Sequence, residues 1–240
     1  MLPALRSAAT YIGVTLYVLL VGGPFVLLAI VLGNPAILYR IGHIGVRLGL
    51  LTSGITSTIE GAANIQRHRA AVYAVNHASN VEPPIVFDVL HELFPRLRIL
   101  YKAELHKLPV LGRAFDLAGF VPLERANREQ SLPAIDRAAG ALREGYSFLI
   151  FPEGTRSRTG KLLPFKKGGF ILAIKGGAPV VPIAITGTRD AMRKGSPIIH
   201  PVHVRVRIGE PVDTTGMTLD DRDELATLLH QRIEALLNAE

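Results

Sequence analysis

The chain has 240 residues, 48% of them hydrophobic, so it can form one domain with a sizeable core, and it is too apolar to be disordered. It has no cysteine, which excludes disulfide scaffolds, thiolate zinc sites, iron–sulfur clusters and cysteine nucleophiles. The net charge of +7 indicates a partner that carries phosphate or an anionic membrane surface, although nucleic acid would also fit the charge alone.

The amino end contains a long apolar segment. Between Arg6 and Arg40 there are 33 residues without an Asp, Glu, Lys or Arg. Within this stretch Ala8–Leu32 is nearly all apolar, and its 25 residues exceed the roughly 20 that cross a bilayer. The apolar region of a secretory signal peptide is shorter, about 7–15 residues. Because Gly22-Gly23-Pro24 interrupts the segment, it fits either one kinked span or a re-entrant hairpin.

The next segment, Pro35–Leu51, has apolar residues at helical spacing beside a stripe of Arg40, His43 and Arg47. This pattern predicts a helix at the lipid interface with its cations toward phosphate headgroups. An ordinary core helix with a solvated basic stripe is the alternative. Basic residues are more numerous after the amino-terminal segment than before it, which predicts that the main domain is cytoplasmic, at the cell membrane. We therefore expect membrane-embedded or interfacial helices over residues 1–57 and a catalytic domain over 58–240.

From about residue 58 onward, short β-type runs alternate with helical ones. The expected strands are Ala71–Val75, Arg98–Tyr101, Gly119–Leu123, Ser147–Phe151, Val180–Thr186 and Val202–Ile208. The expected helices are Pro84–Leu93, Pro109–Leu117, Glu129–Arg143, Lys167–Lys175 and Asp220–Leu237. This alternation predicts an α/β layered domain with a largely parallel sheet flanked by helices, in which functional groups gather at the carboxyl ends of the strands.

The first candidate motif follows an apolar strand and contains His77 and Glu82, five positions apart. On a continuous helix these side chains would be rotated roughly 140° apart, so a pair requires a turn between them. The intervening Ala-Ser-Asn suits a turn, and Pro83 favours an extended Glu82 before a helix begins. The carboxylate could then hold one imidazole nitrogen and leave the other free, as in a general base that acts on a hydroxyl. A solvated loop pair is the alternative.

The second motif, Phe151-Pro152-Glu153-Gly154-Thr155-Arg156-Ser157, also follows an apolar strand. Gly154 permits close approach of the backbone, and the guanidinium of Arg156 matches phosphate oxygens. From Gly154 through Arg189 there are seven Lys or Arg residues and no acidic residue. A solvated basic face is one interpretation. Because the run begins where a strand ends, a pocket for an anionic substrate is the better one.

These motifs resemble those of the PlsC-type glycerolipid acyltransferases, the 1-acylglycerol-3-phosphate O-acyltransferase family, over roughly residues 58–210. The resemblance rests on four ordered blocks: Asn76-His77 through Glu82, Gly119 through Arg125, Phe151 through Ser157, and Val181 through Ile185. The third block matches the family's Phe-Pro-Glu-Gly-Thr-Arg-Ser without departure. Two departures stand elsewhere: Glu82 replaces the family's usual Asp, and Pro122 stands where a bulky apolar residue is common.

The resemblance implies transfer of a fatty acyl group from acyl-CoA or acyl-carrier protein to the sn-2 hydroxyl of lysophosphatidate at an anionic membrane. His77 would be the general base and Glu82 would orient it. The substrate-binding residues that it implies are Lys102, Arg125, Glu153, Gly154, Thr155 and Arg156. Lys102 has the alternative of an exposed strand-end lysine, and Glu153 that of a structural acceptor of backbone N–H groups. No metal or organic cofactor is expected, and the acyl donor is a co-substrate.

Other functional classes fit less well. A serine hydrolase would need a Gly-x-Ser-x-Gly elbow, which is missing. A nucleotide-binding loop at Gly154–Lys161 would have four residues between its glycines rather than five, and a Ser or Thr in place of Leu162. A nucleic-acid module would not explain the uncharged amino-terminal segment. An acyltransferase for another lysolipid, such as a lyso-amino-lipid, and a non-catalytic lipid-binding membrane protein both remain as alternatives.

Overall fold

The computed structural model describes residues 2–124, 128–193 and 195–239. Its centre is a seven-stranded sheet in the order β1-β7-β6-β2-β5-β3-β4. The strands are β1 Thr56–Glu60, β2 Val72–Val75, β3 Leu97–Lys102, β4 Val121–Leu123, β5 Ser147–Ile150, β6 Val180–Thr186 and β7 His203–Ile208. All neighbours pair in parallel except β6 and β7, so the expected largely parallel sheet is confirmed.

The helices of the body follow the α/β alternation predicted from the sequence. They are α4 Glu82–Val89, α5 Pro109–Leu117, α6 Arg128–Arg143, α7 Gly168–Gly176, α8 Thr188–Ala191 and α9 Arg222–Asn238. Short 3₁₀ turns lie at Ala62–Asn64, His91–Leu93, Ala103–Lys107 and Leu219–Asp221. The short helix α8 had no counterpart among the expected helices.

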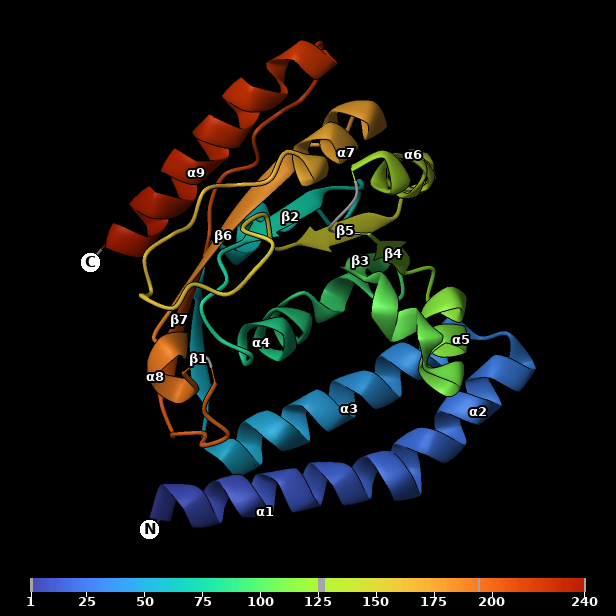
Figure 1. Cartoon of the computed structure of the whole chain (residues 1–240), viewed down its shortest axis with the longest axis vertical. Helices are drawn as coiled ribbons and strands as arrows, with labels where there is room; N and C mark the ends of the chain where they lie inside the picture. Colours follow the sequence, from blue (N-terminus) through green and yellow to red (C-terminus); the bar gives the residue numbers. More distant parts are fainter. Residues whose placement is uncertain (1, 125–127, 194, 240) are drawn as a thin grey trace.

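The two faces of the sheet bury different sets of side chains. Because side chains alternate along a strand, Val72 and Ala74 of β2 lie on one face while Tyr73 and Val75 lie on the other. The first face packs against α6, α7 and α9, and the second packs against α4. Figure 1 shows the resulting layers, with α4 between the sheet and the amino-terminal helices.

One strand was not expected from the sequence. β1 begins at Thr56, three residues after the preceding helix ends at Ser53, and pairs in parallel with β7 at the edge of the sheet. The expected division between residues 57 and 58 therefore falls inside this strand. All five residues of β1 are exposed, so the strand has no buried face to produce an alternating hydrophobic pattern.

The amino-terminal segment forms a bent helix followed by an antiparallel return. α1, Leu2–Tyr17, continues through a π-helical turn, Val18–Gly22, into α2, Gly23–Leu32. In this turn the N–H of Gly23 donates to the carbonyl of Val18, five residues back, which accommodates Pro24 without breaking the helix. The chain reverses only at Gly33, whose φ of 60° is left-handed. Residues 2–32 thus match the kinked alternative, and the interruption at Gly22-Gly23-Pro24 is not a point of reversal.

The third helix, α3 Pro35–Ser53, runs back beside α1 and packs on α4. The expected basic stripe on α3 is divided. Arg40 and Arg47 are exposed, whereas His43 Nε2 lies 2.6 Å from Asp88 Oδ1 of α4. The ring of His43 also stacks on His91 with a centroid separation of 5.0 Å. The prediction that His43 faces lipid headgroups is therefore wrong, because α4 supplies an acidic partner that periodicity along α3 does not reveal.

The helix Leu2–Leu32 is long and apolar enough to cross a membrane by length and composition, with a mean hydropathy of 2.5. Only 11% of its most apolar window is buried inside the protein. Its exposed large apolar side chains are Leu2, Leu5, Tyr11, Ile12, Leu16, Val18, Leu19, Leu20, Phe25, Leu27, Leu28, Val31 and Leu32. We call this set the outer apolar face.

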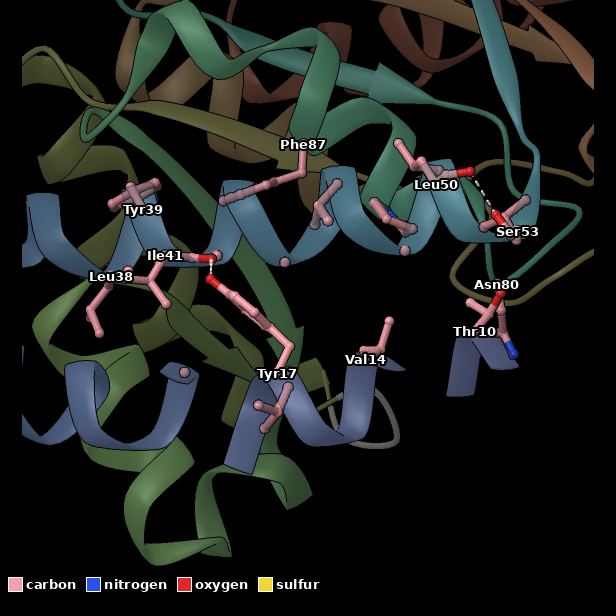
Figure 2. Close-up of a pocket in the computed structure, with 18 of the residues that line it drawn as sticks. Thr10, Val14, Tyr17, Leu38, Tyr39, Ile41, Leu50, Ser53, Asn80 and Phe87 are labelled. Atoms are coloured by element: carbon pink, nitrogen blue, oxygen red, sulfur yellow. Dashed lines mark hydrogen bonds between the residues drawn. The ribbon is translucent and has the colours of Figure 1, made fainter. Parts of the chain in front are cut away.

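A cavity of about 690 Å³ lies between these amino-terminal helices and the body of the protein. Figure 2 shows side chains of α1 and α3 among those that line it, with the hydroxyl of Tyr17 donating to the carbonyl of Ile41 at 2.7 Å between the two helices. α3 contributes three glycines to the lining, and at one of them, Gly45, an added Cβ would lie 2.7 Å from the ring of Tyr17, so glycine permits the close approach of α1 and α3. Asn80 lies at one end of the cavity, in the loop that carries the first candidate motif. The cavity is thus predominantly apolar and reaches the segment that contains His77.

Candidate active site

The candidate site lies where the central strands of the sheet end. Strands β2, β5, β3 and β6 are mutually parallel, so their carboxyl ends meet there. His77 follows β2, Glu153 follows β5, and Lys102 ends β3. The fold therefore brings together the three segments from which most of the candidate residues come.

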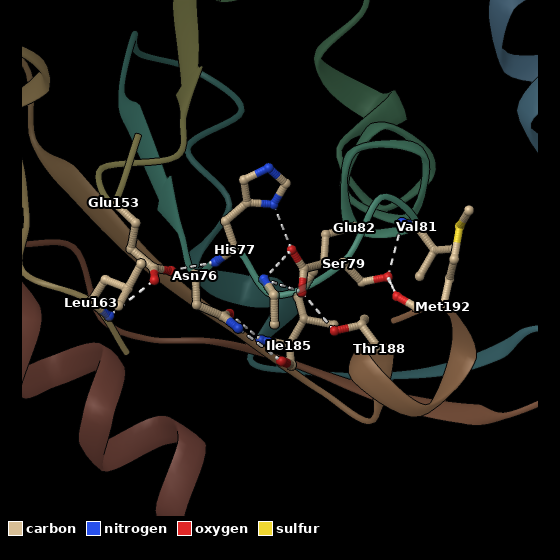
Figure 3. Close-up of polar contacts among 11 residues, drawn as sticks. Asn76, His77, Ser79, Val81, Glu82, Glu153, Leu163, Ile185, Thr188 and Met192 are labelled. Carbon is tan, nitrogen blue, oxygen red and sulfur yellow. Dashed lines mark hydrogen bonds and ion pairs between the residues drawn. The ribbon is translucent and has the colours of Figure 1, made fainter. Parts of the chain in front are cut away.

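Asn76 fixes the end of β2 against the end of β6. Its side-chain amide donates to the carbonyl of Ile185 at 3.1 Å, and its side-chain oxygen accepts the N–H of the same residue at 2.7 Å. Figure 3 shows this paired contact beneath the imidazole of His77. Asn76 is buried, and its side chain pairs with the main chain in the manner of a neighbouring strand residue. The residue before the imidazole is thus held by the sheet.

The expected pair of His77 and Glu82 is present in the structure. His77 Nδ1 lies 2.8 Å from Glu82 Oε2, and because a carboxylate accepts hydrogen bonds, the ring nitrogen is the donor. The turn required by the five-residue spacing is made by Ala78 through Val81, and Glu82 is the first residue of α4. Ser79 serves as the expected turn former, since its hydroxyl accepts the N–H of Val81. The same hydroxyl donates to the carbonyl of Met192.

The side chain of Glu82 is more deeply buried than that of His77, which is the arrangement that an accessible imidazole base with a carboxylate behind it requires. The side chain of Glu82 is 0% exposed and that of His77 is 17% exposed. The main-chain N–H of Ala78 donates to both oxygens of Glu82, at 2.9 and 2.8 Å. Nε2 of His77 has no hydrogen-bond partner among the described residues, and the ring packs on Phe151 with a centroid separation of 4.5 Å. The carboxylate is thus buried behind an imidazole that keeps one nitrogen available.

Glu153 is 3% exposed and holds two backbone segments together. One of its oxygens accepts the main-chain N–H of His77 and the other accepts that of Leu163, at 2.9 Å (Figure 3). Burial raises the pKa of Glu153, and these two N–H donors lower it by less. These contacts are those of the structural alternative, in which Glu153 accepts backbone N–H groups.

The loop after Glu153 turns back over the site. Gly154 has a φ of 67°, and a Cβ added to it would lie 2.8 Å from the side chain of Lys166. Glycine is therefore required here by conformation and by close approach. Thr155 is exposed and Arg156 is half-buried. The N–H of Ser157 donates to the carbonyl of His77 at 2.7 Å, which joins the second motif to the first.

Lys102, another candidate residue, lies at the surface where β3 ends. Lys102 is 56% exposed and pairs with Glu104 at 3.0 Å, as an exposed strand-end lysine would. Arg125 lies outside the described residues. Within the basic run, Lys167 pairs with Asp223 and Lys175 with Asp136. These two lysines are therefore neutralised by acidic residues of α9 and α6.

One contact to the pair was not expected from the sequence. The hydroxyl of Thr188 donates to Glu82 Oε1 at 2.6 Å, and Thr188 is 1% exposed. It is separated from Glu82 by 106 residues, and it lies just after the fourth block. A buried threonine after a glycine is too common a pattern to identify such a contact in advance.

Comparison with known proteins agrees with this geometry. A family model described as acyltransferase matches residues 56–186. The 1-acyl-sn-glycerol-3-phosphate acyltransferase of Limnanthes douglasii is 36% identical over 209 residues, which are 86% of this chain and 70% of that protein. The protein of the same name from Cocos nucifera is 33% identical over 79% of this chain and 60% of its own length.

The fold also matches a solved structure. The crystal structure of the 1-acyl-sn-glycerophosphate acyltransferase PlsC from Thermotoga maritima superposes with a TM-score of 0.79 at 29% identity. The match covers 99% of this chain and 97% of that one, so it includes the amino-terminal helices as well as the sheet. The resemblance drawn from the four blocks is thereby confirmed. The chain belongs to the PlsC-type acyltransferase family and is an acyltransferase enzyme.

Proposed function

We propose that this enzyme transfers a fatty acyl group from a thioester, acyl-CoA or acyl-carrier protein, to the sn-2 hydroxyl of 1-acylglycerol-3-phosphate, giving phosphatidic acid. The observation that carries the proposal is the His77 imidazole, bound at Nδ1 by the buried carboxylate of Glu82 and open at Nε2. The names of the relatives support the choice of acceptor.

In the proposed reaction, Nε2 of His77 takes the proton of the acceptor hydroxyl as its oxygen attacks the thioester carbonyl. The resulting imidazolium is stabilised by the carboxylate of Glu82, which itself stays unprotonated. The tetrahedral intermediate then breaks its C–S bond, and the imidazolium returns the proton to the departing thiolate. No acyl-enzyme is required, because base catalysis acts directly on the attacking hydroxyl.

The acceptor's phosphate is proposed to bind the basic loop after β5. Arg156 follows the glycine turn, and the side chain of Lys166 packs against Gly154. Arg189 reaches the same loop, since a Cβ on Gly160 would lie 3.1 Å from its side chain. A guanidinium matches phosphate oxygens with paired donors. Lys102 and Arg125 are retained as further candidates for the same anion.

The acyl chains are proposed to occupy the cavity between the amino-terminal helices and α4. Its volume of about 690 Å³ is within the range of small-molecule sites, about 300–1,000 Å³, and its lining is predominantly apolar. Asn80 connects it to the loop of His77. A chain lying there would leave its polar head at the edge of the sheet.

The enzyme is proposed to act at the cell membrane from its cytoplasmic side. The outer apolar face of α1 and α2 presents thirteen large apolar side chains to the surroundings, which would be costly in water. Burial of this face in the lipid would bring the active-site edge to the level of the headgroups, with anionic lipids near Arg40 and Arg47.

The test is an acyl-transfer assay with labelled acyl-CoA on purified membranes. The acceptors are lysophosphatidate and a monoacylglycerol of the same chain. We expect turnover with lysophosphatidate only, and a fall of about 10²–10⁴-fold in His77→Ala. His230→Ala is the matched control, because its ring is also half-buried against a phenylalanine, with a centroid separation of 4.9 Å.

Two outcomes would overturn the proposal. Turnover with phosphate-free acceptors alone would assign the enzyme to another lysolipid, such as a lyso-amino-lipid. Unchanged lipid binding in His77→Ala, with no turnover in the parent protein, would indicate a non-catalytic lipid-binding protein.

A further inference from the structure

The second oxygen of the Glu82 carboxylate has a partner of its own. Oε2 faces the imidazole of His77, whereas Oε1 accepts the hydroxyl of Thr188 at 2.6 Å (Figure 3). Thr188 is the first residue of α8 and lies two positions beyond the residues matched by the family model. The contact therefore comes from a part of the chain to which none of the four blocks assigns a role.

This contact acts on the terminal torsion of the Glu82 side chain. The terminal torsion of a glutamate side chain, which turns the carboxylate plane, is broad and lacks sharp staggered minima. The N–H of Ala78 lies almost equally far from both oxygens, so it holds the carboxylate in place without choosing its rotation. A hydrogen bond from Thr188 to Oε1 fixes that rotation and points Oε2 at the imidazole.

Thr188 is itself firmly placed. It follows Gly187, whose φ of 88° is left-handed and whose Cβ position would lie 3.0 Å from the carbonyl of His203. Its β-branched side chain has restricted rotation about χ1, and it is fully enclosed. At the other end of α8, the carbonyl of Met192 accepts the hydroxyl of Ser79 at 2.7 Å. The turn containing α8 therefore forms hydrogen bonds with both the Glu82 carboxylate and the loop between His77 and Glu82.

We propose that Thr188 is a positioning residue for catalysis, which holds the Glu82 carboxylate in the orientation that keeps the proton of His77 on Nδ1. This inference rests on the proposed role of His77 as general base. When the carboxylate turns away, the hydrogen bond that selects the Nδ1–H tautomer weakens. The population with a proton on Nε2 then rises, and in that form the imidazole cannot accept the proton of a hydroxyl.

The kinetic test compares Thr188→Val with Thr188→Ser. Valine keeps the shape of threonine and removes the donor, whereas serine keeps the donor. We expect kcat to fall about 10- to 100-fold in Thr188→Val, the effect of losing a hydrogen bond to a charged group, while KM for the acceptor changes little. Thr188→Ser is expected to retain kcat within about threefold, because its hydroxyl can still donate.

The matched control is Thr214→Val. Thr214 is also buried, at 2% exposure, and its hydroxyl donates to a backbone carbonyl, that of Ala178, at 3.1 Å. The two variants are compared by kcat and by melting temperature. If both lose the same thermal stability and the same kcat, the effect is one of folding and the proposal is overturned. A loss confined to position 188 and restored by serine supports it.

A second readout does not depend on which lipid the enzyme acylates. Histidine-selective ¹⁵N NMR of the full chain in detergent micelles reports the tautomer of each ring, and comparison with His77→Gln identifies the signals of His77. We expect the Nδ1–H form in the parent protein and in Thr188→Ser, and a mixture with the Nε2–H form in Thr188→Val. An unchanged His77 tautomer in Thr188→Val would overturn the proposal. If the parent protein acylates no lysolipid, the proposed function fails, while the tautomer comparison still decides whether Thr188 positions the pair.

Discussion

The main-chain N–H of His77 donates to the buried carboxylate of Glu153 at 2.5 Å, across 76 residues of chain. The carbonyl of His77 accepts the N–H of Ser157, so both sides of this residue are bound to one loop. The backbone of the imidazole is thus fixed by the second motif, and its ring is fixed by the first. A change in either motif is therefore expected to act on the same imidazole.

The variant Glu153→Gln tests this linkage. Its amide can accept one of the two N–H donors, but its NH₂ group then faces the other, which leaves a buried donor unsatisfied. We expect the free energy of unfolding to fall by about 1–3 kcal/mol, together with a loss of kcat through displacement of His77. Chemical denaturation in detergent and the acyl-transfer assay measure the two effects.

Glu144→Gln is the control for this variant, because Glu144 is an exposed glutamate at the end of the segment that precedes β5. It is expected to leave both quantities within experimental scatter, as for most surface substitutions. If Glu153→Gln retained full stability, the two N–H contacts would contribute nothing to the fold, and the linkage between the motifs would be refuted.

The pH dependence of stability offers a separate check on Glu153. Burial raises the pKa of this carboxyl above its ordinary value of 4.5. Between 4.5 and the raised pKa the native protein binds more protons than the unfolded chain, so this group lowers stability as pH increases. The contribution of Glu153 to the free energy of unfolding is therefore fully present below pH 4.5, and it is lost as the pH rises through the native pKa.

The measurement is the difference in melting temperature between the parent protein and Glu153→Gln, over about pH 4 to 7. Gln does not titrate, so other groups cancel in the difference. We expect the advantage of the parent protein to shrink as pH increases. An advantage that grows with pH would mean that hydrogen bonding to the carboxylate outweighs burial and that the native pKa of Glu153 lies below 4.5 rather than above it.

The length of the acidic side chain at position 82 supplies a third prediction. The carboxylate of Glu82 reaches His77, Ala78 and Thr188 together. An aspartate on the same backbone is shorter by one methylene and cannot maintain all of these contacts. We expect Glu82→Asp to lose about tenfold in kcat, the effect of one weakened hydrogen bond, although aspartate is the family's usual residue. We expect Glu82→Gln to lose on the order of 10³- to 10⁴-fold, because an amide cannot stabilise the imidazolium.

Steady-state kinetics with lysophosphatidate measures both variants. Glu92→Gln is the control, because Glu92 pairs with Arg67 at the surface, where its side chain is 43% exposed. Full activity in Glu82→Gln would show that the imidazole works without a carboxylate behind it. Activity in Glu82→Asp equal to that of the parent protein would show that the additional methylene has no part in positioning.

Local patterns predicted the sheet well where its strands are buried. Val180–Thr186 and Pro109–Leu117 have the bounds expected from the sequence, because a continuous apolar run and a proline at a helix start are strong local signals. β1 was not predicted because it is an exposed edge strand that pairs only with β7 among the described strands. A strand that is stabilised mainly by backbone pairing shows little alternation of apolar and polar side chains in its sequence.

The pair at the centre of the site was predictable because its members are close in sequence. The turn chemistry between His77 and Glu82 is a local feature. The extended Glu82 expected from Pro83 is wrong, because α4 already begins at Glu82. Contacts between distant segments were not predictable in the same way. Thr188 contacts Glu82 across 106 residues of chain, and Asp88 pairs with His43 across 45. Such partners are set by the packing of elements, which a single sequence does not encode locally.

The outer apolar face supplies the last prediction. Leu20 is 71% exposed on the π-helical turn between α1 and α2, away from the core. In the lipid its side chain would be buried, and a glutamate there would bring a charge into a region that cannot solvate it. We expect Leu20→Glu to weaken binding of the full chain to vesicles that contain anionic lipid, by at least about tenfold in co-sedimentation, because the loss combines leucine burial with charge desolvation. Thermal stability in detergent should change little, since Leu20 contributes little to the core.

Leu219→Glu is the matched control for this substitution, because Leu219 is also an exposed leucine, at 42%, but lies beside α9 on the opposite side of the sheet. It introduces the same charge change, so equal loss of vesicle binding in both variants would reveal a general electrostatic effect. If Leu20→Glu bound vesicles as tightly as the parent protein, the outer apolar face would not be the membrane-binding surface. Loss confined to Leu20→Glu would assign membrane binding to α1 and α2 through apolar contact, because net charge is the same in the two variants.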